Sequence, residues 1–181
     1  MKKNNILKMT SAAVFAAVIF AVTAFVSIKL PLFSEGYFNL GDCFIIIAAL
    51  SLGPLWGGLA GGIGAALADL MLGYVVYSPA TFVIKFLMAV AAYYVFTGIK
   101  KTGLKYETAA AAAAAVVAEL VMISGYFLFE MPMYGFAVAV ADIAGNATQG
   151  VCNFIAGTVI YGVLSKTGVI RKLFGKKEIS Q

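Results

Sequence analysis

The chain has 181 residues, of which 62% are hydrophobic and only 12% are charged. A soluble domain has about 45–50% apolar and about 25% charged residues, so this chain lacks the polar side chains needed to cover a surface in water. The composition excludes an ordinary soluble protein. It predicts an integral membrane protein in which residues 1–181 form a single domain.

The net charge of +5 does not indicate a nucleic-acid-binding protein, because most of the 13 basic residues fall into three groups along the chain. The cytoplasmic segments of membrane proteins are enriched in lysine and arginine. When successive apolar segments alternate in direction, all three groups lie on the same side of the membrane. We therefore expect both termini to be cytoplasmic, together with Lys2, Lys3 and Lys8; Lys100, Lys101 and Lys105; and Lys166, Arg171, Lys172, Lys176 and Lys177.

The residue types of this chain give little support for a metal site or a bound cofactor. The chain has no histidine, which removes the commonest metal ligand and the commonest general base. Its two cysteines, Cys43 and Cys152, lie far apart in apolar sequence and have no metal-binding spacing. We interpret both as packing residues and predict no metal site and no cofactor.

Six apolar segments follow one another, and each predicts a transmembrane helix. The first has no charged residue and is long enough to cross the hydrocarbon layer, whereas the second and third are short or interrupted by glycine on either side of Gly53-Pro54. Met131-Pro132 is expected to end the fifth helix. The predicted fold is an all-α membrane protein with helices at residues 9–28, 42–53, 56–74, 79–99, 107–129 and 136–164.

Small residues mark surfaces where two membrane helices approach closely. In the first span, alanines recur at three- and four-residue spacing and form one stripe, which consists of Ala12, Ala13, Ala16 and Ala17. This stripe either packs inside the chain or docks a partner protein. The glycines between Gly53 and Gly64 form a similar surface, for which we favour internal packing.

Ionisable side chains inside the spans are few. Each costs at least ~2.5–3.5 kcal/mol near the centre of a lipid-facing helix, so it needs a partner or a function. The residues are Asp69, Lys85, Glu119 and Asp142, with Asp42 at a helix entrance. Asp69 and Lys85 lie at similar depth in the third and fourth spans. Lys85 therefore either forms a salt bridge with Asp69 or presents its ammonium group to a ligand.

The polar residues of the last two spans share helical faces. Four of them recur at steps of three or four residues in the sixth span: Asp142, Asn146, Gln149 and Asn153. Glu119 and Tyr126 share a face of the fifth span. Lipid cannot satisfy these groups, so they point into the bundle, where they either bond neighbouring helices or line a polar pocket. The aromatic loop Phe33–Phe38 is placed to close such a pocket from outside.

Several motifs, in their order and spacing, resemble the S component (the substrate-binding subunit) of energy-coupling factor (ECF) transporters. They are Phe38-Asn39-Leu40-Gly41-Asp42, Gly53-Pro54-Leu55-Trp56-Gly57-Gly58, Gly64-Ala65-Ala66-Leu67-Ala68-Asp69, Gly73-Tyr74, and Pro79-Ala80-Thr81 followed by Lys85. The similarity covers about residues 12–100, and the last two spans match in the placement of polar residues. The resemblance implies a six-helix fold in the cell membrane and a substrate bound near the outer surface.

The same resemblance implies partners. They are a transmembrane coupling subunit, which the alanine stripe would meet, and two cytoplasmic ATPase subunits. It also implies that the whole subunit topples in the membrane to deliver its substrate. We therefore expect a transport subunit and not an enzyme, because ATP hydrolysis belongs to the partner subunits.

The predicted substrate is a small vitamin or vitamin precursor captured from outside. The chain lacks the loop pattern of riboflavin-binding members, which favours a smaller ring such as pyridoxine or hydroxymethylpyrimidine. Two other functions stay open, namely an intramembrane enzyme that uses Asp69, Glu119 or Asp142, and a stand-alone small permease. The expected substrate-binding residues are Lys85, Glu119, Asn146, Gln149, Asn153, Tyr126, Tyr37, Phe38 and Asn39.

Overall fold

The fold is described from a computed structural model, for residues 3–103, 107–168 and 170. It consists of six helices, which confirms the all-α prediction. They are α1 (Lys3–Phe25), α2 (Gly41–Leu52), α3 (Pro54–Leu72), α4 (Ser78–Lys101), α5 (Glu107–Tyr134) and α6 (Phe136–Lys166). The cytoplasmic placement of the termini stays a prediction. Several of the basic residues on which it rests lie outside the described residues, namely Lys2, Lys105, Arg171, Lys172, Lys176 and Lys177.

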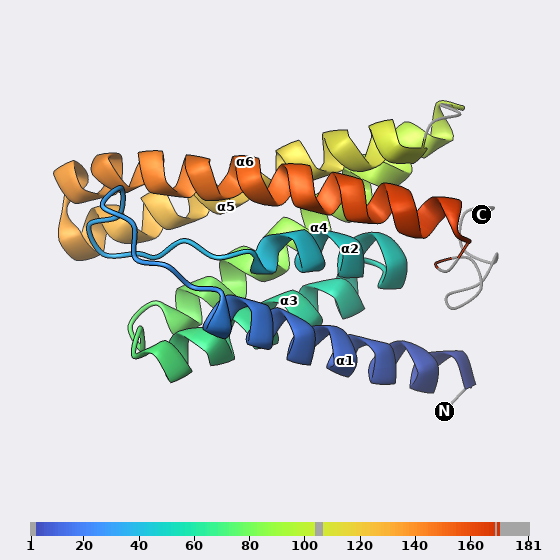
Figure 1. Cartoon of the computed structure of the whole chain (residues 1–181), viewed down its shortest axis with the longest axis horizontal. Coiled ribbons are helices and arrows are strands. Elements are labelled where there is room, and N and C mark those ends of the chain that lie inside the picture. The colour runs from blue at the N-terminus through green and yellow to red at the C-terminus, as the bar shows by residue number, and fades with distance from the viewer. Residues whose placement is uncertain (1–2, 104–106, 169, 171–181) are drawn as a thin grey trace.

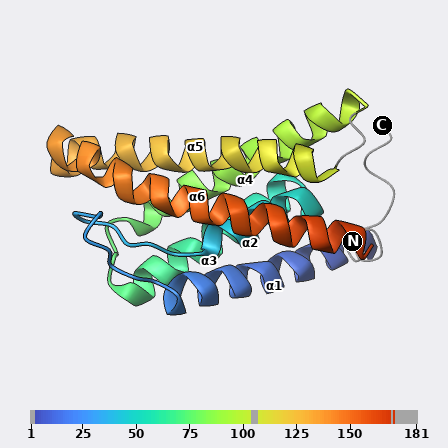
Figure 2. The same ribbon diagram turned by 45° about the horizontal axis from the view of Figure 1, so that its top comes forward.

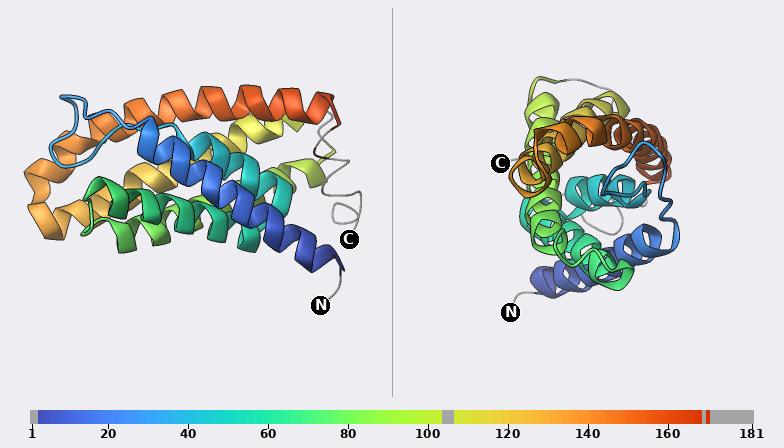
Figure 3. Two further views of the ribbon diagram at one scale, coloured as in Figure 1. Left: turned by 60° about the horizontal axis from the view of Figure 1, so that its bottom comes forward. Right: turned by 90° about the vertical axis from the view of Figure 1, so that its left-hand side faces the viewer.

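Five of the six helices, all except α2, are long and apolar enough to cross a membrane. With 12 residues, α2 is about 18 Å long, which is well short of the ~30 Å hydrocarbon layer. It is instead the innermost helix, in contact with the other five (Figure 3, right). Its consecutive residues Phe44–Leu50 are apolar on all sides, as a helix without a lipid or water face requires.

The helices approach closely at small residues. A Cβ atom added at Gly57 of α3 would lie 2.5 Å from the Cα of Ala49 in α2. One added at Gly64 would lie 2.5 Å from the carbonyl oxygen of Ala16 in α1. The prediction that these α3 glycines serve internal packing is confirmed. On α5, a run of buried alanines lets α4 and α6 pack against it: Ala110, Ala111, Ala114, Ala115 and Ala118.

Three helix ends differ from the prediction by three or more residues. Helix α1 begins at Lys3 rather than at residue 9. Helix α1 ends at Phe25 rather than at residue 28, because the backbone of Ile28 pairs with Phe38 in an antiparallel bridge, with two N–O distances of 2.9 Å. Helix α5 does not end at Met131-Pro132 but continues to Tyr134. Proline removes one backbone hydrogen bond, which is tolerated in the last turn, and the chain turns only at Gly135, where φ is +91°.

A long loop, residues 26–40, connects α1 to α2 and shapes the functional end of the bundle. It runs from the end of α1 toward the end of the molecule that lies away from the start of α1, and then descends between α6 and α1 to the start of α2 (Figure 1). Figure 2 shows α5 and α6 side by side above it. Because α2 begins deep in the bundle, the loop brings its last residues to the level of the polar side chains of α4 and α6.

Candidate ligand-binding site

A polar pocket lies beneath the loop, between α3, α4, α5 and α6. About 420 Å³ at this site is not filled by protein atoms, and this volume includes open solvent at the mouth of the pocket. Phe33 and Tyr37 of the loop form part of its wall, so the loop closes over the space as predicted. The polar side chains that line it are Thr23, Tyr37, Asn39, Asp69, Tyr74, Tyr77, Thr81, Lys85, Tyr126, Glu130, Asn146 and Gln149.

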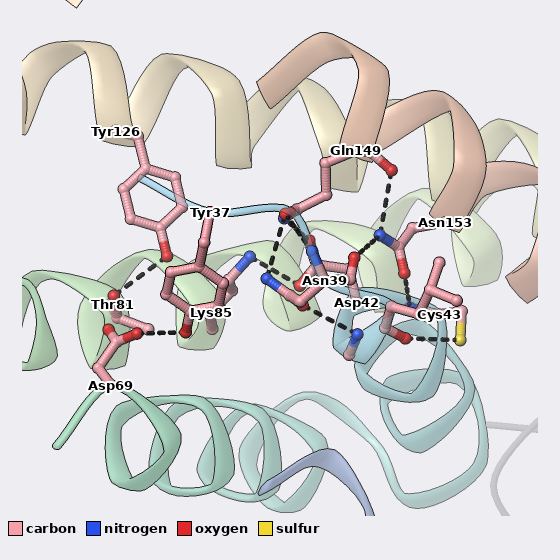
Figure 4. A network of polar contacts seen from close by, with 12 residues as sticks. Tyr37, Asn39, Asp42, Cys43, Asp69, Thr81, Lys85, Tyr126, Gln149 and Asn153 are labelled. Atoms are coloured by element: carbon pink, nitrogen blue, oxygen red, sulfur yellow. Dashed lines mark hydrogen bonds and ion pairs between the residues drawn. The ribbon is translucent and has the colours of Figure 1, made fainter. Parts of the chain in front are cut away.

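The inner end of the loop is fixed by two carboxamides of α6. The side-chain oxygen of Gln149 accepts hydrogen bonds from the backbone N–H of Asn39 at 3.0 Å and from its side-chain amide at 3.1 Å. The side-chain amide of Asn153 donates to the carbonyl of Asn39 at 2.8 Å, and its oxygen accepts from the N–H of Cys43 at 3.0 Å (Figure 4). These bonds hold the loop and the first turn of α2 against α6.

Asp142 fixes the tip of the loop in a similar way. Its two carboxylate oxygens accept hydrogen bonds from the backbone N–H groups of Ser34 and Glu35. The ring of Phe33 packs on Gly145, one turn further along α6, where a Cβ atom would lie 2.8 Å from the ring. Asp142 therefore positions the loop and does not line the pocket.

Lys85 forms its salt bridge with Asp42 rather than with Asp69. The ammonium nitrogen lies 2.6 Å from the Asp42 carboxylate, and both side chains are almost completely buried. The second oxygen of Asp42 accepts a bond of 2.9 Å from the amide of Gln149. The pairing with Asp69 that the sequence left open is not formed, because the descending loop places Asp42 beside Lys85. Lys85 also lies 5.2 Å from the ring centre of Tyr126.

Two tyrosine–carboxylate pairs occupy the outer part of the pocket. The Tyr37 hydroxyl donates to Asp69 at 2.5 Å, and the Tyr77 hydroxyl donates to Glu130 at 3.2 Å. Burial and the adjacent carboxylates raise the pKa of Tyr37 and of Tyr77 well above the usual value, so both hydroxyls keep their protons and act as donors. In each pair the second carboxylate oxygen is buried and has no hydrogen-bond partner among the described residues.

Aromatic rings link these two pairs into one wall. The ring centres of Tyr37 and Tyr74 lie 4.8 Å apart, and those of Tyr74 and Tyr77 lie 6.1 Å apart. Tyr126 continues the wall at 6.3 Å from Tyr77, and its hydroxyl lies 3.1 Å from that of Thr81. This arrangement suits a flat ring that is held by stacking on one side and by polar groups at its edge.

Six of the nine predicted substrate-binding residues meet in the pocket: Tyr37, Asn39, Lys85, Tyr126, Asn146 and Gln149. The other three lie outside it. Phe38 pairs with Ile28 through its backbone, and Asn153 lies one turn beyond Gln149, where it holds the loop. Glu119 is buried against α6, beside Gly150, and borders an apolar groove instead. A direct role in substrate binding stays a prediction for all nine.

Six polar residues that line the pocket were not among the predicted substrate-binding residues: Thr23, Asp69, Tyr74, Tyr77, Thr81 and Glu130. Of these, Tyr77 and Glu130 were assigned to connecting segments. A signal for Glu130 was present, because it follows Tyr126 by four residues and so shares its helical face. Because the fifth helix was predicted to end before Glu130, the shared face of Tyr126 and Glu130 was not recognised.

A second surface feature is an open apolar groove between α1 and α3. Its α1 side contains the predicted docking stripe, in which Ala13 and Ala17 are exposed while Ala12 is buried. The groove is lined by Met9, Ala12, Ala13, Ala16, Ala17, Phe20, Trp56, Leu59, Ala60, Ile63 and Leu67. The stripe therefore agrees in part with both explanations. The buried Ala12 packs inside the chain, whereas the exposed Ala13 and Ala17 are accessible to a partner protein.

Comparison with known proteins gives consistent matches. The model of a family described as ECF-type riboflavin transporter, S component, matches residues 3–166. An uncharacterized protein from Pyrococcus woesei is 35% identical over 144 residues, which are 80% of this chain and 92% of the relative. The thiamine precursor transporter HmpT of Lactococcus lactis subsp. cremoris is 25% identical over 174 residues, which are 94% of this chain and 95% of the relative.

Two solved structures share the fold. The S component of a bacterial ECF transporter superimposes with a TM-score of 0.70 at 18% identity, covering 88% of this chain and 96% of that chain. ThiT from Listeria monocytogenes superimposes with a TM-score of 0.68 at 17% identity, covering 95% of this chain and 99% of that chain.

Proposed function

Because the chain belongs to the family of ECF-type riboflavin transporter S components, we propose that it captures a small heteroaromatic vitamin or vitamin precursor for an ATP-driven importer. As a family member it is a membrane-embedded transport subunit and not an enzyme. The favoured ligand has a single ring of the pyridoxine or hydroxymethylpyrimidine type. The partners are a transmembrane coupling subunit and two ATPase subunits.

The observation that carries this proposal is the polar pocket itself. Lys85 uses one hydrogen bond for Asp42, and its remaining N–H groups are available to an acceptor on a ligand. Asn146 borders the same space with a carboxamide that takes part in none of the hydrogen bonds found among the described residues. Donors and acceptors thus surround a tyrosine wall, which suits a ring with polar substituents.

A single ring is favoured over the larger ring system of riboflavin for a structural reason. Phe33 and Tyr37 both line the pocket from the loop, and Gln149 holds the loop in place through Asn39, so these side chains take up space that a larger ring system would need. The similarity to HmpT, a thiamine precursor transporter, supports a ligand of the pyrimidine type. The riboflavin description of the family model makes riboflavin the most important competing ligand in any test.

Purified protein is expected to gain thermal stability with one compound of a vitamin and precursor panel. A ligand that binds only the folded state, present at about 100 times its Kd, stabilises that state by about 2.7 kcal/mol. Differential scanning fluorimetry in detergent, with riboflavin, thiamine, pyridoxine and hydroxymethylpyrimidine in the panel, measures this shift. A complete panel without any shift would contradict ligand capture, and a shift with riboflavin alone would contradict the single-ring preference.

The alanine groove supports docking to the coupling subunit, because two exposed small residues on α1 allow a partner helix to approach closely. Ala17→Trp is expected to abolish uptake by the reconstituted transporter and to leave ligand binding unchanged, since Ala17 is exposed and does not line the pocket. Val14→Trp is the matched control, because Val14 is also exposed on α1 but does not line the groove. Equal loss of binding and uptake in Ala17→Trp would show that the stripe serves internal packing.

A further inference from the structure

The outer part of the pocket has an excess of acidic groups. Three carboxylate side chains border it or are bonded to its wall, namely Asp42, Asp69 and Glu130. Among the described residues that line the pocket, Lys85 is the one basic side chain, and Asp42 already neutralises it at 2.6 Å. Neither Asp69 nor Glu130 forms an ion pair with a basic side chain among the described residues.

Both of these carboxylates are only partly hydrogen-bonded. One oxygen accepts a hydrogen bond from a tyrosine, Tyr37 for Asp69 and Tyr77 for Glu130. The other oxygen makes no hydrogen bond of ordinary length among the described residues, although Asp69 is only 3% and Glu130 only 1% exposed. For Asp69 the Thr81 hydroxyl is a nearby donor, so Glu130 is the less satisfied of the two. A buried carboxylate oxygen without a donor is costly, which indicates that a donor arrives with the ligand.

The rings between the two carboxylates also favour a cation. Tyr74 stands between Tyr37 and Tyr77, with ring centres 4.8 and 6.1 Å away. The faces of aromatic rings attract positive charge, and cages of such rings recognise organic ammonium groups. A metal ion is a poorer match, because the described residues contain no group of three histidine, cysteine, aspartate or glutamate side chains able to hold one.

We infer that the ligand carries a positive charge, which it places on the side of the pocket lined by Asp69 and Glu130, against the wall formed by Tyr37, Tyr74 and Tyr77. This inference rests on the proposed function and specifies the chemistry of its ligand. Asp69 and Glu130 are then specificity-determining residues that select cationic rings over neutral and anionic ones. Lys85 and Asn146, deeper in the same pocket, contact the uncharged part of the ring.

The test uses two series in which one ring carries three different substituents. For the pyridoxine ring these are pyridoxamine, pyridoxine and 4-pyridoxic acid, which bear an ammonium group, a hydroxyl group and a carboxylate at the same position. The aminomethyl, hydroxymethyl and carboxylate forms of the 4-amino-2-methylpyrimidine ring give the second series. Isothermal titration of the purified protein is expected to show the ammonium compound binding at least about tenfold tighter than its hydroxyl counterpart. The carboxylate compound is expected to bind weakest.

Charge-neutral variants identify the residues responsible. Asp69→Asn and Glu130→Gln keep the shape of each side chain and are each expected to weaken binding of the cation about tenfold, with a much smaller effect on the hydroxyl compound. Glu107→Gln is the matched control, because Glu107 is an acidic residue at the start of α5, at the other end of that helix from Glu130, and does not line the pocket. Its affinity for the cation is expected to stay within about threefold of the wild type.

The outcomes separate this inference from the proposed function. If the tightest ligand of the series and of the vitamin panel is neutral or anionic, the inference is wrong while ligand capture stands. If the cation binds tightest but both charge-neutral variants bind it as the wild type does, the assignment of Asp69 and Glu130 is wrong. If no compound binds, ligand capture and this inference are both contradicted.

Discussion

Asp42→Ala is expected to lower the free energy of unfolding by about 3–5 kcal/mol. The substitution removes the carboxylate that lies 2.6 Å from Lys85 and leaves the ammonium group buried without its partner. It also removes the acceptor of the Gln149 amide at 2.9 Å. Denaturant-induced unfolding in mixed micelles, followed by circular dichroism, measures the loss.

Two further variants make this prediction specific. Glu107→Ala breaks a second salt bridge, with Lys100 at 2.9 Å, and a hydrogen bond from the Ser165 hydroxyl at 2.6 Å. The side chains of Glu107 and Lys100 are 42% and 16% exposed, so we expect a loss of at most about 2 kcal/mol. Combining Asp42→Asn with Lys85→Met removes the unpaired charge and is expected to restore part of the stability lost in Asp42→Ala. A loss in Asp42→Ala no larger than that in Glu107→Ala would show that the buried pair is unimportant.

Asn153→Leu is expected to cost about 2–6 kcal/mol and to weaken ligand binding through the loop. Leucine has a similar size but leaves the N–H of Cys43 and the carbonyl of Asn39 without their side-chain partner, at about 1–3 kcal/mol for each buried group. Faster hydrogen exchange of the Cys43 amide and faster proteolysis within residues 26–40 report the released loop.

Thr148→Val on the same helix is the control for this variant. The Thr148 hydroxyl bonds the carbonyl of Ala144 in the preceding turn, so its loss is expected to change stability by no more than about 0.5 kcal/mol. Unchanged exchange of the Cys43 amide in Asn153→Leu would contradict the anchoring role of Asn153.

The helices of this protein could be predicted from its sequence because a helix that crosses lipid must be long and apolar, and its polar side chains must point into the bundle. The spacing of Asn146, Gln149 and Asn153 correctly placed them on one face of α6. The spacing of polar residues along a helix does not identify which segment of the chain packs against their face. Gln149 and Asn153 meet Asn39, which is more than 100 residues away in the chain, and their carboxamides hold a loop in addition to bordering a pocket.

The partner of Lys85 was unpredictable for a related reason. Helix rise gives the depth of Asp69 and Lys85 in neighbouring spans, and on depth alone their pairing was reasonable. It does not give the depth of Asp42, because that depends on how far the preceding loop descends into the bundle. The short α2, which starts near the middle of the bundle, brings Asp42 to Lys85 and leaves Asp69 to Tyr37.

The short, fully enclosed α2 also decides how a captured molecule leaves. From Lys85 to the end of α4, about 24 Å of helix is packed against buried isoleucines of α2 and alanines of α5. This half of the bundle contains most of the buried apolar core, so opening a path through it is expected to cost much of the stability of the fold. We therefore expect an occupant of the pocket to leave by the entrance it used. Net transfer across the bilayer would then need the entrance itself to face the other side.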